Sequence, residues 1–218
     1  MQKRFVLSAC AMALGVAGAA FAHDEETVMR KLDLAGFDAI TIAGVYELDV
    51  RVGPDFSVEL SGPAYEMDRV EASVDNGALV LGQRKRMKGE KNRNNRDGVE
   101  AVITLPSLKA VNISGVVDGH ISDVDADDFT VKISGVGDLE IDGECGALDA
   151  HLSGVGDLDA RNLECGVAEV KVSGVGSAIV FASDEIDAKV SGMGDIDVYG
   201  SPEKVSKNKS MFADITVH

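Results

Sequence analysis

The sequence contains no tryptophan and only three tyrosines, Tyr46, Tyr65 and Tyr199. A platform on which a sugar ring could stack is therefore difficult to assemble from this chain. No segment shows the apolar spacing of an amphipathic helix, and parallel strands without helical crossovers cannot form βαβ units. These absences argue against an α/β fold and against a conventional carbohydrate cleft.

Long apolar runs are absent after the N-terminus. Residues 1–22 combine a basic start (MQKR), an apolar run and the cleavage pattern Ala20-Phe21-Ala22, which together predict a secretory signal peptide cleaved near Ala22. No later run reaches the ~20 residues of a membrane span. The stretch Leu7-Ser8-Ala9-Cys10 also fits a lipobox, so a lipoprotein is the alternative. We expect a periplasmic, extracellular or cell-surface protein of a Gram-negative-type bacterium, with a linker at 23–36 and one domain at 37–218.

Positive charge is scarce, with 21 Lys and Arg against 37 Asp and Glu. Loss of Lys3 and Arg4 with the signal peptide takes the net charge from −16 to −18. Such a chain repels nucleic acid and anionic lipid, so we expect no nucleic-acid partner. The exception is the segment 84–96, predicted to be a solvated loop insertion. Its basic residues are candidate contacts for an anionic partner: Arg84, Lys85, Arg86, Lys88, Lys91, Arg93 and Arg96.

A short phrase recurs along the chain: SGVGDL begins at Ser134 and Ser153, SGVGS at Ser173 and SGMGDI at Ser191. Counted from Ser114, these serines are 20, 19, 20 and 18 residues apart, and such a period is typical of a solenoid. Apolar residues alternate before each phrase, as strands with one buried face do. The sequence thus predicts an all-β, single-stranded, parallel and right-handed β-helix with coils of 18–20 residues, stacked about 4.8 Å apart.

Weaker copies of the phrase lie nearer the N-terminus. Residues 41–50 match 132–141 position by position, and Val58–Gly62 repeats the start of the phrase eighteen residues later. We expect both segments to form coils of the same solenoid, which would begin near Phe37 and end near Val217.

The glycines of the phrase allow two interpretations, a phosphate-binding loop or a corner of each coil. No helix opens after them and the phrase recurs four times, which favours the corner. At a corner, glycine supplies a positive φ or close packing, and serine hydroxyls form a ladder that satisfies turn groups. The predicted corner residues are Gly135, Gly154, Gly174, Gly192, Ser134, Ser153, Ser173 and Ser191.

Stacked coils also align charged residues into columns. One column holds Asp118, Asp138, Asp157, Ser177 and Asp195, and another holds Asn112, Lys132, His151, Lys171 and Lys189. Calcium along the aspartates is an alternative to simple exposed turns, but hard cations need six or more oxygen ligands. His120 and His151 fall at different repeat positions, so they do not form a metal pair. We expect no cofactor and no catalytic or metal-binding residue.

Cys145 and Cys165 each lie eight residues before a corner serine. They therefore occupy one column of adjacent coils, within the Cα distance that a disulfide spans. Export to an oxidising compartment favours the bridge, and Cys10 leaves with the signal peptide. Two reduced, apolar cysteines stacked in the wall are the alternative.

The segments GFDAITIAGVYELDVRVG and VITLPSLKAVNISG, followed by the SG repeats, resemble the bacterial head GIN-domain family, described as autotransporter adhesins. The resemblance covers about residues 34–200 and implies a secreted or periplasmic β-helical domain. We therefore expect a non-catalytic envelope protein, adhesin-like or structural, whose partner is a glycan or protein. The alternative is a carbohydrate-active enzyme, which a groove with carboxylates about 5–10 Å apart would favour.

Overall fold

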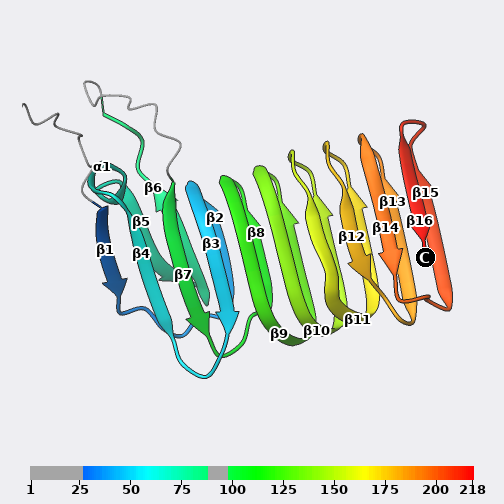
Figure 1. Cartoon of the computed structure of the whole chain (residues 1–218), viewed down its shortest axis with the longest axis horizontal. Helices are drawn as coiled ribbons and strands as arrows, with labels where there is room; N and C mark the ends of the chain where they lie inside the picture. Colours follow the sequence, from blue (N-terminus) through cyan, green and yellow to red (C-terminus); the bar gives the residue numbers. More distant parts are fainter. Residues whose placement is uncertain (1–26, 88–97) are drawn as a thin grey trace, which may run out of the picture.

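The computed structural model describes residues 27–87 and 98–218. They form stacked β-coils whose strands line up into two facing β-walls (Figure 1). The first wall contains, in spatial order, β1 (Thr27–Leu32), β4 (Ser57–Pro63), β7 (Val99–Leu105), β3 (Val45–Val52), the first parts of β9 (Val116–Ile133), β10 (Val136–Leu152) and β11 (Leu158–Val172), then β12 (Ala178–Phe181), β14 (Gly194–Tyr199) and β16 (Ala213–Val217). The second wall contains β5 (Val70–Asp75), β6 (Ala78–Gln83), β2 (Ala39–Ala43), β8 (Ala110–Ile113), the second parts of β9, β10 and β11, then β13 (Glu185–Val190) and β15 (Lys204–Lys209).

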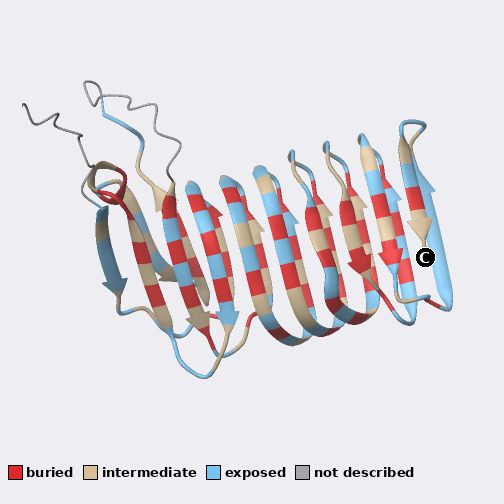
Figure 2. Ribbon diagram, in the orientation of Figure 1, coloured by how far each residue is buried: buried red, intermediate tan, exposed pale blue. Residues whose placement is uncertain are grey.

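The coils stack in parallel with equivalent residues side by side, as the repeat predicts. Leu148 pairs with Phe129 of the coil before it and with Ala168 of the coil after it. All three side chains are at most 2% exposed, and buried and exposed residues alternate along the strands (Figure 2). The core is therefore the narrow space between the walls, filled by one column of apolar side chains per inward position, and the predicted parallel β-solenoid is confirmed.

The corner opposite the SG phrase does not interrupt the strands. β9, β10 and β11 each run through this corner as one long bent strand (Figure 1). Asp123 and Gly143, with φ of 60° and 133°, provide the bend, and the strand register shifts beside them. Hydrogen bonds between coils continue on both sides of the bend, so it does not end the strand.

The N-terminal end departs from the solenoid. The segment Val58–Gly62, expected to be another coil, belongs to β4, which is antiparallel to both β7 and β1. Only residues 53–56 connect β3 to β4, and a connection of that length allows a hairpin but no parallel crossover. The expected linker at 23–36 contains β1, so in its described part it belongs to the first wall. Alternation thus identified the buried face of β4 but not the direction of the strand.

A buried carboxylate anchors the start of the basic segment. Glu66, in the short helix α1 (Ala64–Met67), is 8% exposed and forms ion pairs with Arg69 and with Arg86, the latter at 2.7 Å. The Arg69 guanidinium also donates to the Arg84 carbonyl oxygen at 3.0 Å. Arg84 and Arg86 are therefore held against the N-terminal end, although residues 84–87 form no helix or strand and Lys85 and Arg86 are exposed. The other expected contacts Lys88, Lys91, Arg93 and Arg96 lie outside the described residues.

Lysines face the interior at the C-terminal end. Lys207 and Lys209 of β15 pair with the buried Ala188 and Val190, so they occupy inward positions that are apolar one coil earlier. Lys207 Nζ donates to the Ile215 carbonyl oxygen at 3.2 Å, and Lys209 pairs with Asp214. Inward charges on an edge strand discourage further strand pairing, so this coil closes the stack. In the described part of the chain no helix is long and apolar enough to cross a membrane.

Candidate functional site

Two glycine columns shape the SG corner. A Cβ added to Gly154 would lie 1.9 Å from the Gly135 carbonyl oxygen of the preceding coil, and Gly135, Gly174 and Gly192 are equally crowded. The positive φ lies two residues further on, at 145° to 150° in Gly137, Gly156, Gly176 and Gly194. Both columns are closely packed, because a Cβ added to Gly137 or Gly156 would also lie within 2 Å of a carbonyl oxygen of the preceding coil, and the second column needs the positive φ as well. The sequence prediction named only the first, although the second glycine of every SGxG phrase was visible.

The backbone amides at the SG corner donate hydrogen bonds to carbonyl oxygens of neighbouring coils. Val155 N donates to the Gly135 carbonyl oxygen at 3.0 Å, and Gly156 N donates to the Val175 carbonyl oxygen at 3.1 Å. The hydroxyls of Ser134 and Ser173 likewise donate to backbone carbonyls of the coil before. These groups hold the stack together and leave no cradle of free donors for a phosphate.

Cys145 and Cys165 form a disulfide between adjacent coils, as predicted. The two residues are register partners, and their Cα atoms are 4.5 Å apart. Both side chains are buried, with 9% and 2% of their surface exposed. Its burial between two coils indicates that the bridge has a structural role.

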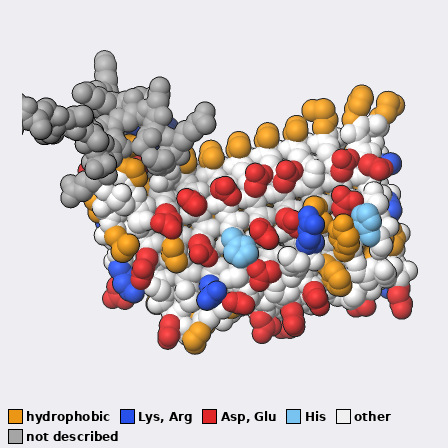
Figure 3. Space-filling model, in the orientation of Figure 1, with side chains coloured by type: hydrophobic (Ala, Val, Ile, Leu, Met, Phe, Trp, Pro, Cys, Tyr) orange, Lys and Arg blue, Asp and Glu red, His pale blue; other side chains and the backbone are white. Residues whose placement is uncertain are grey.

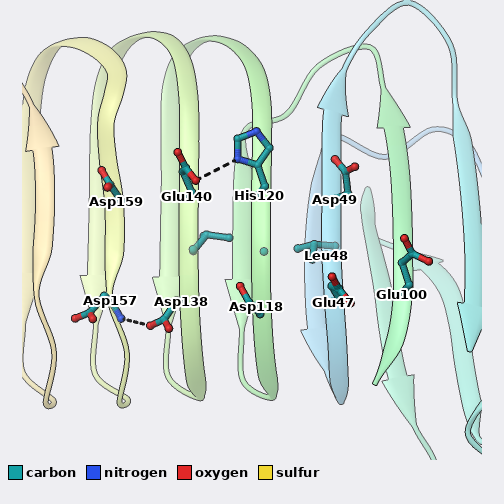
Figure 4. Close-up of a pocket in the computed structure, with 12 residues that line it drawn as sticks. Glu47, Leu48, Asp49, Glu100, Asp118, His120, Asp138, Glu140, Asp157 and Asp159 are labelled. Atoms are coloured by element: carbon teal, nitrogen blue, oxygen red, sulfur yellow. Dashed lines mark hydrogen bonds and ion pairs between the residues drawn. The ribbon is translucent and has the colours of Figure 1, made fainter. Parts of the chain in front are cut away.

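The outer face of the first wall carries a shallow acidic trough of about 520 Å³, which lies next to the SG corner (Figures 3 and 4). Strands β3, β7, β9, β10 and β11 each contribute outward side chains to it. Its ionisable lining residues, called the acidic trough below, are Glu47, Asp49, Glu100, Asp118, His120, Asp138, Glu140, Asp157 and Asp159. The sequence predicted one of its columns but not its width across neighbouring strands.

The predicted aspartate column bonds one coil to the next. Asp157 N donates to Asp138 Oδ1 at 3.0 Å (Figure 4), and Ser177 N donates to Asp157 Oδ1 at 2.7 Å. Asp195 accepts from Asp214 N in the same way, at 2.9 Å. These amide bonds offset part of the repulsion between stacked carboxylates. Among the described residues, no three His, Cys, Asp or Glu side chains are grouped so that they could hold a metal ion.

His120 lies at the centre of the trough (Figure 4). Its Nδ1 is 3.8 Å from Glu140 Oε2 and its Nε2 is 3.3 Å from Asp142 Oδ2, and the side chain is 46% exposed. His151 lies on the second wall against Asp149, so the structure does not bring the two histidines together. For Asp159, burial raises the pKa, but the hydrogen bonds and charge of Arg161 outweigh it and hold the pKa below its usual value. Asp159 is thereby kept ionised.

A line of exposed apolar side chains runs along the SG corner above the trough (Figure 3). It is formed by the residue after the first glycine of each phrase and, at its C-terminal end, by Phe212, which precedes Ala213, the register partner of Gly194. Val136, Val155 and Met193 are 49%, 52% and 57% exposed. We call this line the apolar ridge; its members are Val45, Val116, Val136, Val155, Val175, Met193 and Phe212. An apolar residue fills that position in every phrase, but the pattern alone does not show that a valine within a turn is exposed.

These features define a parallel β-solenoid with a repetitive surface, an acidic trough and an apolar corner. The chain belongs to the family described as "Putative auto-transporter adhesin, head GIN domain", whose model matches residues 36–202. This family is the one that the sequence motifs resemble. No protein with a curated description matches the chain.

The chain is similar to several solved structures, one of which shares its fold. A Bacteroides fragilis protein described as a putative adhesin is 24% identical, with 89% of this chain and 98% of that chain covered and a TM-score of 0.74. A Parabacteroides distasonis protein described as a putative lipid binding protein is 19% identical, with 89% and 98% covered and a TM-score of 0.48. A Parabacteroides merdae putative adhesin is 15% identical, with 89% and 97% covered and a TM-score of 0.47.

Proposed function

We propose that this chain is an exported, non-catalytic binding protein of the cell envelope that contacts a surface glycan or protein through the acidic trough. The observation that carries the proposal is repetition: β3, β9, β10 and β11 present carboxylates at equivalent outward positions, as Glu47, Asp118 and Asp138 illustrate. A surface built this way offers many similar weak contacts instead of one focused centre. Membership of a family described as adhesins agrees with such a role.

The alternative, a carbohydrate-active enzyme, would use the same trough. Its general acid would need a raised pKa, whereas the pKa of Asp159 is held down. The aromatic residues offer little support for a sugar, because Tyr46 is buried and bonded to the Gly82 carbonyl oxygen, and Tyr199 is stacked on His218. These contacts favour binding over catalysis.

Export is supported by two independent features. Residues 1–22 have the pattern of a signal peptide, and the buried Cys145–Cys165 bridge requires an oxidising compartment to form and persist. We place the protein in the periplasm or on the cell surface on these grounds.

Neutralising the trough tests the proposal. We expect the exported chain to bind saturably to at least one of intact bacterial cells, immobilised mucin, fibronectin or peptidoglycan. The variant Glu47→Gln, Asp49→Asn, Asp118→Asn should bind that surface about threefold to 150-fold more weakly, because each of the three lost charges contributes about 0.2–1 kcal/mol. Biolayer interferometry at two salt concentrations measures the change.

A matched control removes the same charge elsewhere. Asp125, Asp128 and Asp187 are exposed carboxylates outside the trough, and their Asn variant should bind like the wild type. Equal weakening by both variants would indicate general charge repulsion and contradict a trough site. Release of reducing ends from soluble polysaccharides by wild type, but not by Asp159→Asn, would instead support the enzyme.

A further inference from the structure

The apolar ridge is a continuous line of exposed side chains along the outer edge of the solenoid. Its register partners follow one another as Val136–Val155–Val175–Met193, so the side chains form a single file at strand spacing. Seven positions at about 4.8 Å give a line roughly 29 Å long. The first six side chains are about half exposed and Phe212 is 77% exposed, so the ridge presents on the order of 500 Å² of apolar surface. That is the size of the largest apolar patch on a typical monomer, which is often functional.

The distance between successive side chains of the ridge determines which kind of partner can contact all of them. An extended peptide presents side chains on one face every ~6.7 Å, and a helix presents them once per ~5.4 Å turn. Either would fall out of step with the valines after two or three contacts. A stack of β-coils repeats at the same ~4.8 Å and stays in step along the whole line. We propose that the ridge docks against the ridge of a second copy of this chain.

The charges beside the ridge set the orientation of the two copies. Asp138 and Asp195 follow the ridge residues by two positions on the first wall, whereas Lys132 and Lys189 precede them by four positions on the second wall. The ridge is thus bordered by an acidic column on one side and a basic column on the other. Any partner that fits must place opposite charges along these borders.

Ridge-to-ridge contact allows two two-fold arrangements. With antiparallel solenoid axes, aspartates face aspartates and lysines face lysines, which is unfavourable. With parallel axes, Lys132 of one copy faces Asp138 in the second copy, and Lys189 faces Asp195, on both sides of the symmetry axis. The dimer is therefore parallel and in register, coil for coil, and its closed symmetry does not propagate into a fibre.

The C-terminal end of the stack does not offer a competing contact. Lys207 and Lys209 point inward at the C-terminal edge, where an incoming strand would have to bury them. The ridge contact is smaller than a standard stable interface, so the dimer is reversible, with a dissociation constant on the order of 1–100 µM. This dimer goes beyond the proposed function and does not depend on the trough having a ligand.

Sedimentation of the exported chain from 1 µM upward measures the dimer. We expect a concentration-dependent monomer–dimer equilibrium, and the variant Val136→Asp, Val155→Asp, Val175→Asp should raise its dissociation constant more than tenfold. The control Val102→Asp, Val167→Asp changes exposed valines outside the ridge and should leave it unchanged. A wild type that stays monomeric at 500 µM, or a dimer equally strong in the ridge variant, overturns the proposal.

Cysteine cross-linking tests the orientation separately. In the parallel dimer, Val136→Cys should cross-link to itself and Val175→Cys to itself, because equivalent coils lie at one level. An antiparallel dimer centred on Val155 would cross-link these two variants only when they are mixed, and that outcome overturns the inferred orientation. Lys132→Asp with Lys189→Asp should weaken the parallel dimer at least threefold by placing four aspartates opposite four.

Discussion

The variant Gly154→Ala should lower the free energy of unfolding by at least about 3 kcal/mol. Its new methyl group would lie 1.9 Å from the Gly135 carbonyl oxygen, and that oxygen already accepts a hydrogen bond from Val155 N, so it cannot move away cheaply. Urea denaturation followed by far-UV circular dichroism measures the loss. The effect is large because the coils are stacked, so the corners of the two coils that adjoin Gly154 must shift together.

Gly82→Ala provides the matched control. Gly82 lies in β6, has no positive φ, and its added Cβ would be 3.9 Å from its nearest neighbour, an ordinary contact. We expect this variant to change stability by less than about 1 kcal/mol. If Gly154→Ala proved as stable as Gly82→Ala, the corners would not pack as closely as the structure shows.

Removing the disulfide should produce the second large effect. The double variant Cys145→Ala, Cys165→Ala should lose about 3 kcal/mol, because the bridge closes a loop with a sequence separation of 20 and restricts the unfolded chain. Reduced wild type should unfold at nearly the same urea concentration as the double variant. Thiol labelling of both cysteines in unreduced, denatured protein would contradict the bridge.

The internal coils were predictable because they repeat. Once Ser134, Ser153, Ser173 and Ser191 are aligned, every inward and outward position of three coils is fixed, and the register of Cys145 with Cys165 follows. The N-terminal end has no such constraint. Alternation in β4 fits either strand direction, and only the short connection from β3 decides for the antiparallel one.

The candidate site was predictable in position but not in role. The aspartate column could be located by counting, yet its bonds to amides of the next coil depend on a stagger that spacing does not encode. The ion pair of Arg86 with Glu66 is not predictable from the sequence, because Glu66 is 20 residues away and its helix has no repeat to align. The ridge was overlooked because exposure at a corner is a property of three-dimensional packing.

Deleting one coil tests most directly whether binding is spread over equivalent coils. Removal of residues 115–134 joins Ser114 to Gly135, restores an SGVG corner, keeps the Cys145–Cys165 bridge and removes Asp118 and His120. We expect this variant to unfold cooperatively and to bind the surface recognised by the wild type less than about threefold more weakly, and a variant with this coil duplicated to bind at least as tightly as the wild type. A folded deletion variant that no longer binds, or a duplication that abolishes binding, would contradict a distributed surface and point to one unique centre.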